Sequence, residues 1–469
     1  MFNLDRYQNN IAVITDKGER LTYSELKAEA SKFADAISQN GLMFCLCENR
    51  LGSLVGYVSC LEHQIPIVLL DGLQDNTLLK NLIGLYHPEY IWVSTEKIGE
   101  IGGRTIYSYA SFSLQQMSYD TDIDCPEINP ELVLCLPTSG STGFPKFVRL
   151  SEKNILGNAE SIAEYLKIDE NERPITTLPL YYSYGVSVIN SHLIKGATIL
   201  LTEGTVVQRD FWQFMKEQKA TSMSGVPYTY EMLKRLRFFR MELPSLKVMT
   251  QAGGKLNKDI AKEYIDFASE KGKKFYVMYG QTEATARMSY LPWESAIQKY
   301  ASIGIAIPWG KFSLMDTDGK EITESDVDGE LIYEGPNVSL GYAESRADLA
   351  KGDENQGVLY TGDLARRDAD GFYYITGRLK RFVKIWGNRC NLDATEQLVK
   401  SITTNCACAG VDDKITVFVT ESGLEEKIIK HLFEKTGLNT KAFEVKVLNN
   451  IPKNDSGKIQ YAELQKLLN

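Results

Sequence analysis

Hydroxyl, glycine and lysine residues are concentrated in one short stretch, LPTSGSTGFPK, at positions 136–146. Glycines let backbone N–H groups point at a ligand, hydroxyls add hydrogen bonds, and a lysine adds a positive charge, a combination that suits an oligophosphate. The stretch follows an apolar segment at 132–136. Because α/β folds bind ligands in loops that follow buried strands, we expect a phosphate loop here. The spacing is not that of a Walker loop, and a polar surface turn is the alternative interpretation.

Four further motifs follow along the chain, and they are YGQTEAT at 279–285, YTGDL at 360–364, GRLKRFVKIWG at 377–387 and PKNDSGKIQ at 452–460. Together with TSGSTGFPK they resemble the ordered motifs of the adenylate-forming superfamily, which includes acyl-CoA synthetases, amino-acid adenylation domains and luciferases. LTYSEL near the start fits the same family, so the resemblance covers nearly the whole chain. Chance is a poor explanation for five motifs in family order.

The resemblance implies that the protein activates a carboxylic acid with ATP, forms an acyl adenylate with release of pyrophosphate, and then passes the acyl group to a thiol. A carboxylate is a poor electrophile, and catalysis of its activation consists of positioning and of neutralising developing charge. The expected cofactors are ATP and Mg²⁺, with coenzyme A or the phosphopantetheine of a carrier protein as thiol acceptor.

The resemblance also assigns roles to residues. Glu283 would hold Mg²⁺, Thr282 would bond the α-phosphate, and Tyr279 would lie against adenine. The mobile cation Lys458 would bridge the carboxylate and the α-phosphate. The expected catalytic set is Lys146, Thr282, Glu283 and Lys458. The expected nucleotide-binding set is Thr138, Ser139, Gly140, Ser141, Thr142, Gly143, Lys146, Gly253, Gly254, Tyr279, Gly280, Thr282, Asp363, Arg378 and Lys458.

Within that set Asp363 would accept hydrogen bonds from the ribose hydroxyls, because a carboxylate offers acceptors only, and Arg378 would support them. Taken one at a time, these residues have plainer interpretations: Asp363 as a turn residue, Lys458 as a surface lysine and Glu283 as an acid near a helix start. Their occurrence together in family order favours the functional interpretation.

Family members run the second half-reaction after the small domain turns about a hinge. Lys380 lies at the hinge position, and Lys384 and Gly387 lie on the loop that would then face the adenylate. The chain stops shortly after Lys458, so we expect any carrier protein to be discrete rather than fused.

The stretch LPLYYSYG, at 178–185, departs from the family pattern. Tyr182 lies where many acyl-CoA synthetases have a histidine, and another register places the neutral Ser183 where amino-acid adenylation domains have an aspartate for the amine. A buried ammonium without a carboxylate is costly, so we expect an acid without an α-amine. Tyrosines 181, 182 and 184 either line the acyl pocket or pack in the core.

Strands and helices that alternate along the chain must position these motifs. Apolar strand-like segments separated by helical ones predict an α/β fold with largely parallel sheets, and the strand-like segments are 44–47, 65–71, 90–94, 132–136, 197–202 and 275–280. The spacing also predicts a helix over 21–38, with Ser24 as a plausible cap.

The 469 residues exceed the roughly 250–300 at which one core gives way to several. We expect an N-terminal domain over 1–379, with a small β-rich part at about 310–379, and a small mobile α+β domain over 380–469.

Composition excludes several classes of protein. The net charge of -9 and the lack of a basic block argue against nucleic-acid binding. We find no transmembrane segment and no signal peptide, and we expect a cytoplasmic protein. The eight cysteines suit reduced thiols, and the four scattered histidines suggest neither a metal cluster nor a Ser-His-Asp site.

Three hypotheses follow. The leading one is a stand-alone acyl-CoA or acyl-carrier ligase, and the second is an amino-acid adenylating ligase that loads a discrete carrier. The third is a catalytically inactive scaffold, which is disfavoured because the expected residues are all present, namely Thr282, Glu283, Asp363, Arg378 and Lys458.

Overall fold

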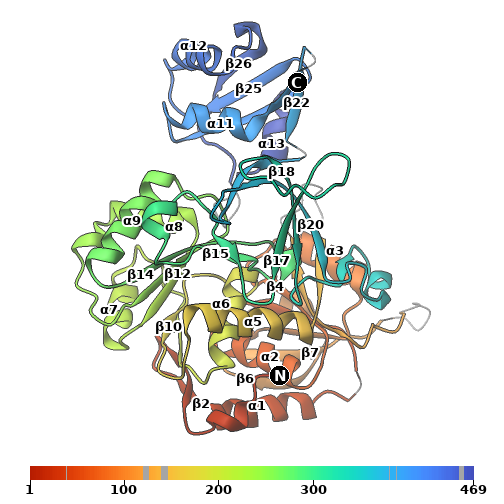
Figure 1. Ribbon diagram of the computed structural model, residues 1–469. Helices are drawn as coiled ribbons and strands as arrows, with labels where there is room; N and C mark the ends of the chain where they lie inside the picture. Colours follow the sequence, from red (N-terminus) through yellow and green to blue (C-terminus); the bar gives the residue numbers. More distant parts are fainter. Residues whose placement is uncertain are drawn as a thin grey trace. The chain divides into compact units, whose positions relative to one another are not determined.

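The computed structural model describes residues 1–38, 40–119, 126–138, 146–379, 381–386, 388–453 and 459–468 (Figure 1). Its contacts divide the chain into two compact units. Unit 1 comprises residues 1–300, 304–311 and 334–359, and unit 2 comprises residues 301–303, 312–333 and 360–469. Residues 360–379 thus group with the C-terminal residues. The expectation that a mobile domain begins at residue 380 stays a prediction.

A nine-stranded sheet in unit 1 is parallel in its interior. Its order is β16-β15-β14-β13-β12-β10-β11-β1-β2, and pairing is parallel from β14 to β1 and antiparallel at both edges. The strands are β1 (Ile11–Thr15), β2 (Arg20–Thr22), β10 (Pro174–Ile175), β11 (Ile199–Leu201), β12 (Ser222–Gly225), β13 (Val248–Gln251), β14 (Lys274–Tyr279), β15 (Ser289–Tyr290) and β16 (Ile305–Ala306).

An eight-stranded sheet in unit 1 has the order β19-β9-β8-β4-β3-β5-β7-β6. Its strands are β3 (Met43–Cys47), β4 (Ile67–Asp71), β5 (Tyr90–Ser94), β6 (Arg104–Tyr109), β7 (Phe112–Gln116), β8 (Leu132–Pro137), β9 (Phe147–Ser151) and β19 (Gly341–Ala343). Only the central strands from β5 to β8 are parallel. The connections β6–β7 and β8–β9 are too short for a crossover, which forces antiparallel pairing. The α/β class is confirmed, and the sheets are mixed rather than largely parallel.

The main core of unit 1 lies between these two sheets and includes residues of four helices, which are α1 (Tyr23–Asp35), α2 (Leu51–Glu62), α5 (Glu152–Leu166) and α6 (Ser183–Leu193). Helix α2 is buried along its length from Leu51 to Leu61. Two glycines allow this close packing, because a Cβ at Gly52 would lie 2.3 Å from the Phe112 ring and one at Gly56 would lie 2.4 Å from Trp92.

The remaining helices of unit 1 are α3 (Asn76–Tyr86), α4 (Ile98–Ile101), α7 (Arg209–Glu217), α8 (Pro227–Arg235), α9 (Lys258–Glu270) and α10 (Ala296–Lys299). Its short 3₁₀ helices are η1 (Leu4–Tyr7), η2 (Thr95–Lys97), η3 (Phe238–Arg240), η4 (Thr282–Ala284) and η5 (Arg346–Ala350).

The cap of α1 differs from the prediction. Thr22, not Ser24, is the N-cap: its hydroxyl accepts from the Glu25 N–H at 3.2 Å, and the Glu25 carboxylate accepts from the Thr22 N–H at 2.7 Å. The chain leaves β2 at Thr22 in an extended conformation, which the cap position requires, whereas Ser24 already lies in the first helical turn.

Unit 2 contains most of a four-stranded sheet formed by β17 (Lys311–Met315), β18 (Gly329–Glu334), β20 (Val358–Arg367) and β21 (Tyr373–Arg378). It continues with β22 (Phe382–Ile385), β23 (Asn388–Asn391), α11 (Leu392–Lys400), β24 (Cys406–Val411), β25 (Lys414–Val419), α12 (Glu425–Thr436), η6 (Thr440–Ala442), β26 (Phe443–Val447) and α13 (Tyr461–Lys466). Helices α11 and α12 cover a small core whose strands are β22, β24, β25 and β26. This is the α+β arrangement expected for the C-terminal end.

Two expected absences can be checked over the described ranges. Within them, no helix combines the length and the apolarity that crossing a membrane requires. No disulfide joins the cysteines that the structure describes.

Arg149 on β9 ties the edge strand β19 and the segment after it to the sheet. Its guanidinium is fully buried and donates to the carbonyl oxygens of Leu340 and Tyr342, each at 3.0 Å, and to that of Lys351. It also forms an ion pair with Glu354 at 2.6 Å. Removing this side chain would leave several carbonyl oxygens without their buried donor, whereas Glu354 is half-exposed and keeps Lys351 at 3.9 Å.

We therefore expect Arg149→Met to destabilise unit 1 by about 1–3 kcal/mol or more, the cost of leaving a buried acceptor unsatisfied, because several carbonyls lose their donor. Lys27→Met, which breaks the exposed pair of Lys27 with Asp5, is the matched control and should cost less than about 1 kcal/mol. Thermal unfolding followed by circular dichroism measures both. Equal melting temperatures for the two variants would contradict the role of Arg149.

Candidate active site

The predicted phosphate loop starts and ends on two paired strands. Strands β8 and β9 are antiparallel, with Pro137 opposite Phe147, and the N–H of Thr138 donates to the carbonyl of Lys146 at 2.9 Å. The Thr138 hydroxyl donates to the same carbonyl at 3.2 Å. The two ends of the loop are thus held together after the carboxyl end of a central strand. The predicted residues Ser139, Gly140, Ser141, Thr142 and Gly143 lie outside the described residues.

Lys146 leaves this loop beside two residues that the sequence analysis did not find. Its ammonium forms an ion pair with Glu344 and lies 5.9 Å from the centre of the Tyr342 ring. The pairing of β19 with β9, which sets Ala343 opposite Phe147, produces this neighbourhood. The Lys146 side chain is 43% exposed, so it remains accessible to a ligand.

The YGQTEAT motif forms a tight turn after β14. A Cβ at Gly280 would lie 1.7 Å from the Ala286 carbonyl oxygen, so only glycine fits there. Thr285 and Ala286 have φ values of 54° and 93°, which are unusual for residues with a side chain. Such backbone costs roughly 1–3 kcal/mol per residue and gathers at functional sites. Next to it, Tyr279 accepts a hydrogen bond from the Gln281 amide at 3.3 Å.

Glu283 is held in place within this turn. Tyr342 donates its hydroxyl to one carboxylate oxygen of Glu283 at 2.7 Å, and the Glu283 carbonyl accepts from the Ser339 N–H at 2.9 Å. Burial, with the Glu283 charge adding to it, raises the pKa of Tyr342 above its ordinary value, so the phenol remains a donor. A single anchored carboxylate fits Mg²⁺, which takes one or two carboxylates and completes its shell with phosphate oxygens and water. The described residues hold no group of three or more His, Cys, Asp or Glu side chains that could bind a metal ion.

The start of α6 contacts the YGQTEAT turn and the loop after β13. The hydroxyls of Ser183 and Thr282 are 3.1 Å apart. A Cβ at Gly253 would lie 2.4 Å from the Tyr182 hydroxyl oxygen, and one at Gly254 would lie 3.2 Å from Pro227, so this backbone is closely packed. The structure therefore brings together residues predicted for the acid with residues predicted for the nucleotide.

The three tyrosines before and within α6 separate into different roles. Tyr181 packs against the main core of unit 1. Tyr184 is buried, and its hydroxyl is 2.7 Å from the Thr250 hydroxyl. Tyr182 lies against Gly253. Core packing accounts for Tyr181, whereas Tyr182 and Tyr184 lie beside the candidate site.

Unit 2 carries the predicted ribose residues as a cross-strand pair. Asp363 on β20 is opposite Arg378 on β21, and the Arg378 Nε donates to an Asp363 oxygen at 2.9 Å. The Asp363 side chain is 5% exposed and the Arg378 side chain 62%. Lys384 is exposed on β22. The predicted Lys380, Gly387 and Lys458 lie outside the described residues.

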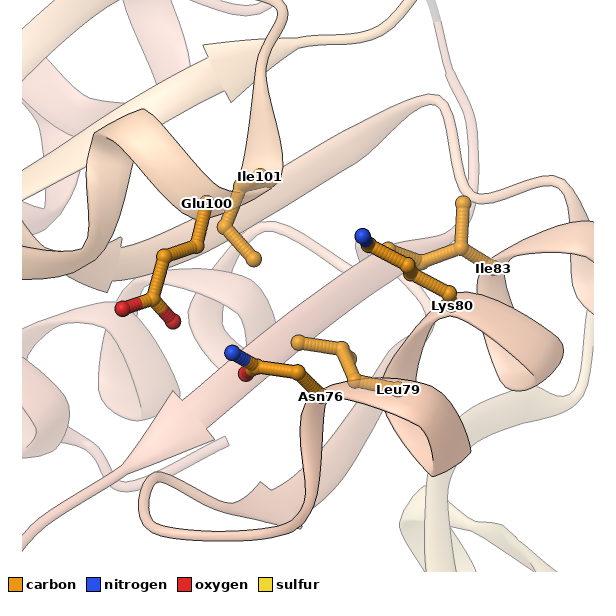
Figure 2. A pocket seen from close by; sticks show the side chains of 6 residues that line it. All are labelled: Asn76, Leu79, Lys80, Ile83, Glu100 and Ile101. Carbon is orange, nitrogen blue, oxygen red and sulfur yellow. The ribbon is translucent and has the colours of Figure 1, made fainter.

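A separate small hollow in unit 1 involves none of these residues (Figure 2). Figure 2 shows Asn76, Leu79, Lys80 and Ile83 of α3 facing Glu100 and Ile101 of α4. The candidate active site is therefore defined by its side chains and turns rather than by this hollow.

Comparisons with known proteins identify the family and the fold. A family model described as "AMP-binding enzyme" matches residues 3–343. Among curated relatives, oxalate–CoA ligase of Arabidopsis thaliana is 28% identical over 70% of this chain and 66% of its own length. The putative acyl-CoA synthetase YngI of Bacillus subtilis is 28% identical over 64% and 52%, respectively. A 2-succinylbenzoate–CoA ligase of Bacillus licheniformis is 27% identical over 95% and 94%. The chain thus spans about half to two thirds of the length of the first two relatives.

Solved structures show the same fold. The o-succinylbenzoate CoA synthetase MenE of Bacillus subtilis matches with a TM-score of 0.78 at 21% identity, over 99% of this chain and 97% of that one. MatB of Rhodopseudomonas palustris matches with a TM-score of 0.79 at 20% identity, over 99% and 98%. Since the family model covers most of the chain, including the strands that carry the loop, the YGQTEAT turn and Tyr342, the protein belongs to the AMP-binding enzyme family.

Proposed function

We propose that this protein joins a carboxylic acid to coenzyme A, with an acyl adenylate as intermediate. The acid's carboxylate attacks the α-phosphate of ATP, pyrophosphate leaves, and the thiol then displaces AMP. Family membership and relatives named as CoA ligases support this proposal. The observation that carries it is the anchoring of Glu283 by Tyr342 beside Lys146, at the end of the predicted phosphate loop.

The residues of unit 1 perform the electrostatic part of the first step. Thr138 and Lys146 bracket the loop, and the Lys146 ammonium can exchange its exposed partner Glu344 for a phosphate oxygen. Thr282 presents a hydroxyl beside Ser183, where the acid and the α-phosphate would meet. Bound Mg²⁺, held by Glu283, would supply positive charge against the phosphates. Donors fixed before the reaction stabilise charge as it develops.

The family motifs in unit 2 would bind the nucleoside and supply the mobile lysine. Asp363 keeps an orientation set by Arg378 and offers acceptors to ribose hydroxyls. Lys458 would neutralise charge at the α-phosphate during adenylation, and the segment with Lys384 and Gly387 would face the thiol after a turn about Lys380. These assignments rest on the family motifs.

Coenzyme A is the acceptor that the relatives' names favour, and a carrier protein remains the alternative. The acids in these names differ widely, so the names do not select one. Ser183, at the start of α6, offers a hydroxyl rather than a carboxylate. This favours an acid without an α-amine over the alternative of an amino-acid adenylating ligase.

Acid-dependent exchange of labelled pyrophosphate into ATP tests the proposal. We expect exchange with non-amino carboxylic acids, followed by thioester formation when coenzyme A is added. An α-amino acid preferred by a wide margin would contradict the substrate class. A thioester formed only on a carrier protein would contradict the acceptor, and silence across a broad panel of acids would favour the inactive scaffold.

Glu283→Gln keeps the shape of the side chain and removes its charge. We expect adenylate formation to fall by about two orders of magnitude or more, because Mg²⁺ loses its protein anchor. The same measurement on Glu263→Gln, an exposed residue paired with Lys234, is the control and should show normal exchange. Near-normal exchange in Glu283→Gln would refute the metal role.

Lys458→Ala and Gly387→Leu should separate the two half-reactions. Losing Lys458 should cost about 3–4 kcal/mol of transition-state stabilisation in adenylation, so exchange fails while supplied acyl adenylate still becomes thioester. Gly387→Leu should do the reverse, because a side chain there would obstruct the thiol arm. Parallel loss of both activities in both folded variants would rule out domain alternation.

A further inference from the structure

Arg287, two residues after the YGQTEAT motif, is buried without a carboxylate. Its exposed fraction is 1%. The two other buried arginines of the described residues each pair with a carboxylate: Arg149 with Glu354 at 2.6 Å and Arg346 with Glu89 at 2.7 Å. No ion pair joins Arg287 to a described acidic residue. Since an uncompensated buried charge costs several kcal/mol, this exception needs an explanation.

The groups around Arg287 are neutral. Its Nη1 donates to the Tyr165 hydroxyl at 3.1 Å and to the Met278 sulfur at 3.3 Å, and the guanidinium lies 5.0 Å from the centre of the Tyr184 ring. Burial, with the Arg287 charge adding to it, lowers the pKa of His192 to about 4, so that imidazole is neutral at neutral pH. The positive charge of this cluster therefore belongs to Arg287 alone.

One edge of the guanidinium has no protein partner. The hydrogen bonds that the side chain makes to described residues leave from Nη1, and Nε is buried without an acceptor. Nε and Nη2 together form the edge on which an arginine binds a carboxylate through two parallel hydrogen bonds. Arg346 also has a buried Nε without an acceptor, so what sets Arg287 apart is that no described carboxylate pairs with its guanidinium.

Arg287 lies close to the candidate active site. A Cβ at Gly280 would be 2.8 Å from the Cα of Arg287, so the arginine backbone packs directly against the YGQTEAT turn. Tyr184, whose ring faces the guanidinium, follows Ser183, and the Ser183 hydroxyl is 3.1 Å from that of Thr282. Arg287 therefore lies next to the residues that we propose for binding the acid.

We propose that Arg287 determines specificity by binding a second carboxylate, so that the substrate is a dicarboxylic acid. One carboxylate attacks the α-phosphate, while the other pairs with Arg287 and does not react. This inference rests on the proposed ligase function and names its substrate class.

Pyrophosphate exchange with matched acids of equal carbon number tests it. Succinate, glutarate, adipate and suberate are compared with butanoate, pentanoate, hexanoate and octanoate. We expect kcat/KM for the best diacid to exceed that of its monoacid at least about 10-fold. Arg287→Met should lower the diacid value at least about 100-fold, because a buried charge pair loses one partner, and should change the monoacid value little.

Thermal unfolding gives a second readout that does not depend on activity. Without ligand, Arg287→Met should melt at the same temperature as the wild type or higher, because it removes an unpaired buried charge. Arg346→Met, the matched control, leaves Glu89 unpaired and should melt lower.

The best diacid should raise the melting temperature of the wild type but not that of Arg287→Met. If Arg287→Met does not fold, Arg287→Lys replaces it. Lysine keeps the positive charge but lacks the two parallel N–H donors of arginine, so KM should rise for the diacid alone.

The outcomes separate this inference from the function on which it rests. Exchange that favours monoacids, or an unchanged diacid preference in the Arg287 variant, overturns the inference and leaves the ligase function standing. Failure of exchange with every acid, while diacids still raise the melting temperature through Arg287, would count against the ligase function and support the binding role of Arg287.

Discussion

The candidate site depends on the antiparallel pairing of β8, β9 and β19 at one edge of the eight-stranded sheet. The β8–β9 pair closes the base of the predicted phosphate loop through Thr138 and Lys146. The addition of β19 then brings Tyr342 and Glu344, almost two hundred residues further along the chain, next to Lys146. Arg149 secures this edge by donating to carbonyls of the β19 segment. The strand pairing and Arg149 together fix the position from which the Tyr342 hydroxyl holds Glu283.

Close backbone approaches order the YGQTEAT turn, which carries Thr282 and Glu283. Gly280 passes against the Ala286 carbonyl, and both Thr285 and Ala286 have positive φ values. A turn this tight is costly, and the surrounding structure maintains it: the Ser339 N–H donates to the Glu283 carbonyl, and the Thr285 hydroxyl donates to the Asn337 carbonyl at 2.7 Å. The gain is that Thr282 and Glu283 are fixed before any ligand binds, which suits a reaction catalysed by positioning and charge.

The buried arginines fall into two groups, those paired with a carboxylate of the chain and Arg287, which we propose binds a carboxylate of the substrate. Arg149 and Arg346 each pair with a carboxylate of the chain and hold segments that are distant in sequence. Arg287 is buried equally well, yet the chain surrounds it with phenols, a thioether and a neutral imidazole. Stability alone would favour an apolar residue there, because the interior gains nothing from an unpaired cation. A ligand that brings its own anion removes this cost.

Local sequence patterns determined the fold class, the order of the motifs and most strand positions, because apolar periodicity and glycine-rich turns act over a few residues. They did not determine the cap of α1, because Thr22 becomes the cap only where the chain leaves β2. They could not reveal Tyr342 or Glu344 as neighbours of Lys146, because the register of β9 with β19 joins segments with no local signal in common. Nor could they show that Arg287 lacks a counter-ion. Which charges face each other is decided by packing between elements far apart in the chain, and only the tertiary structure supplies that.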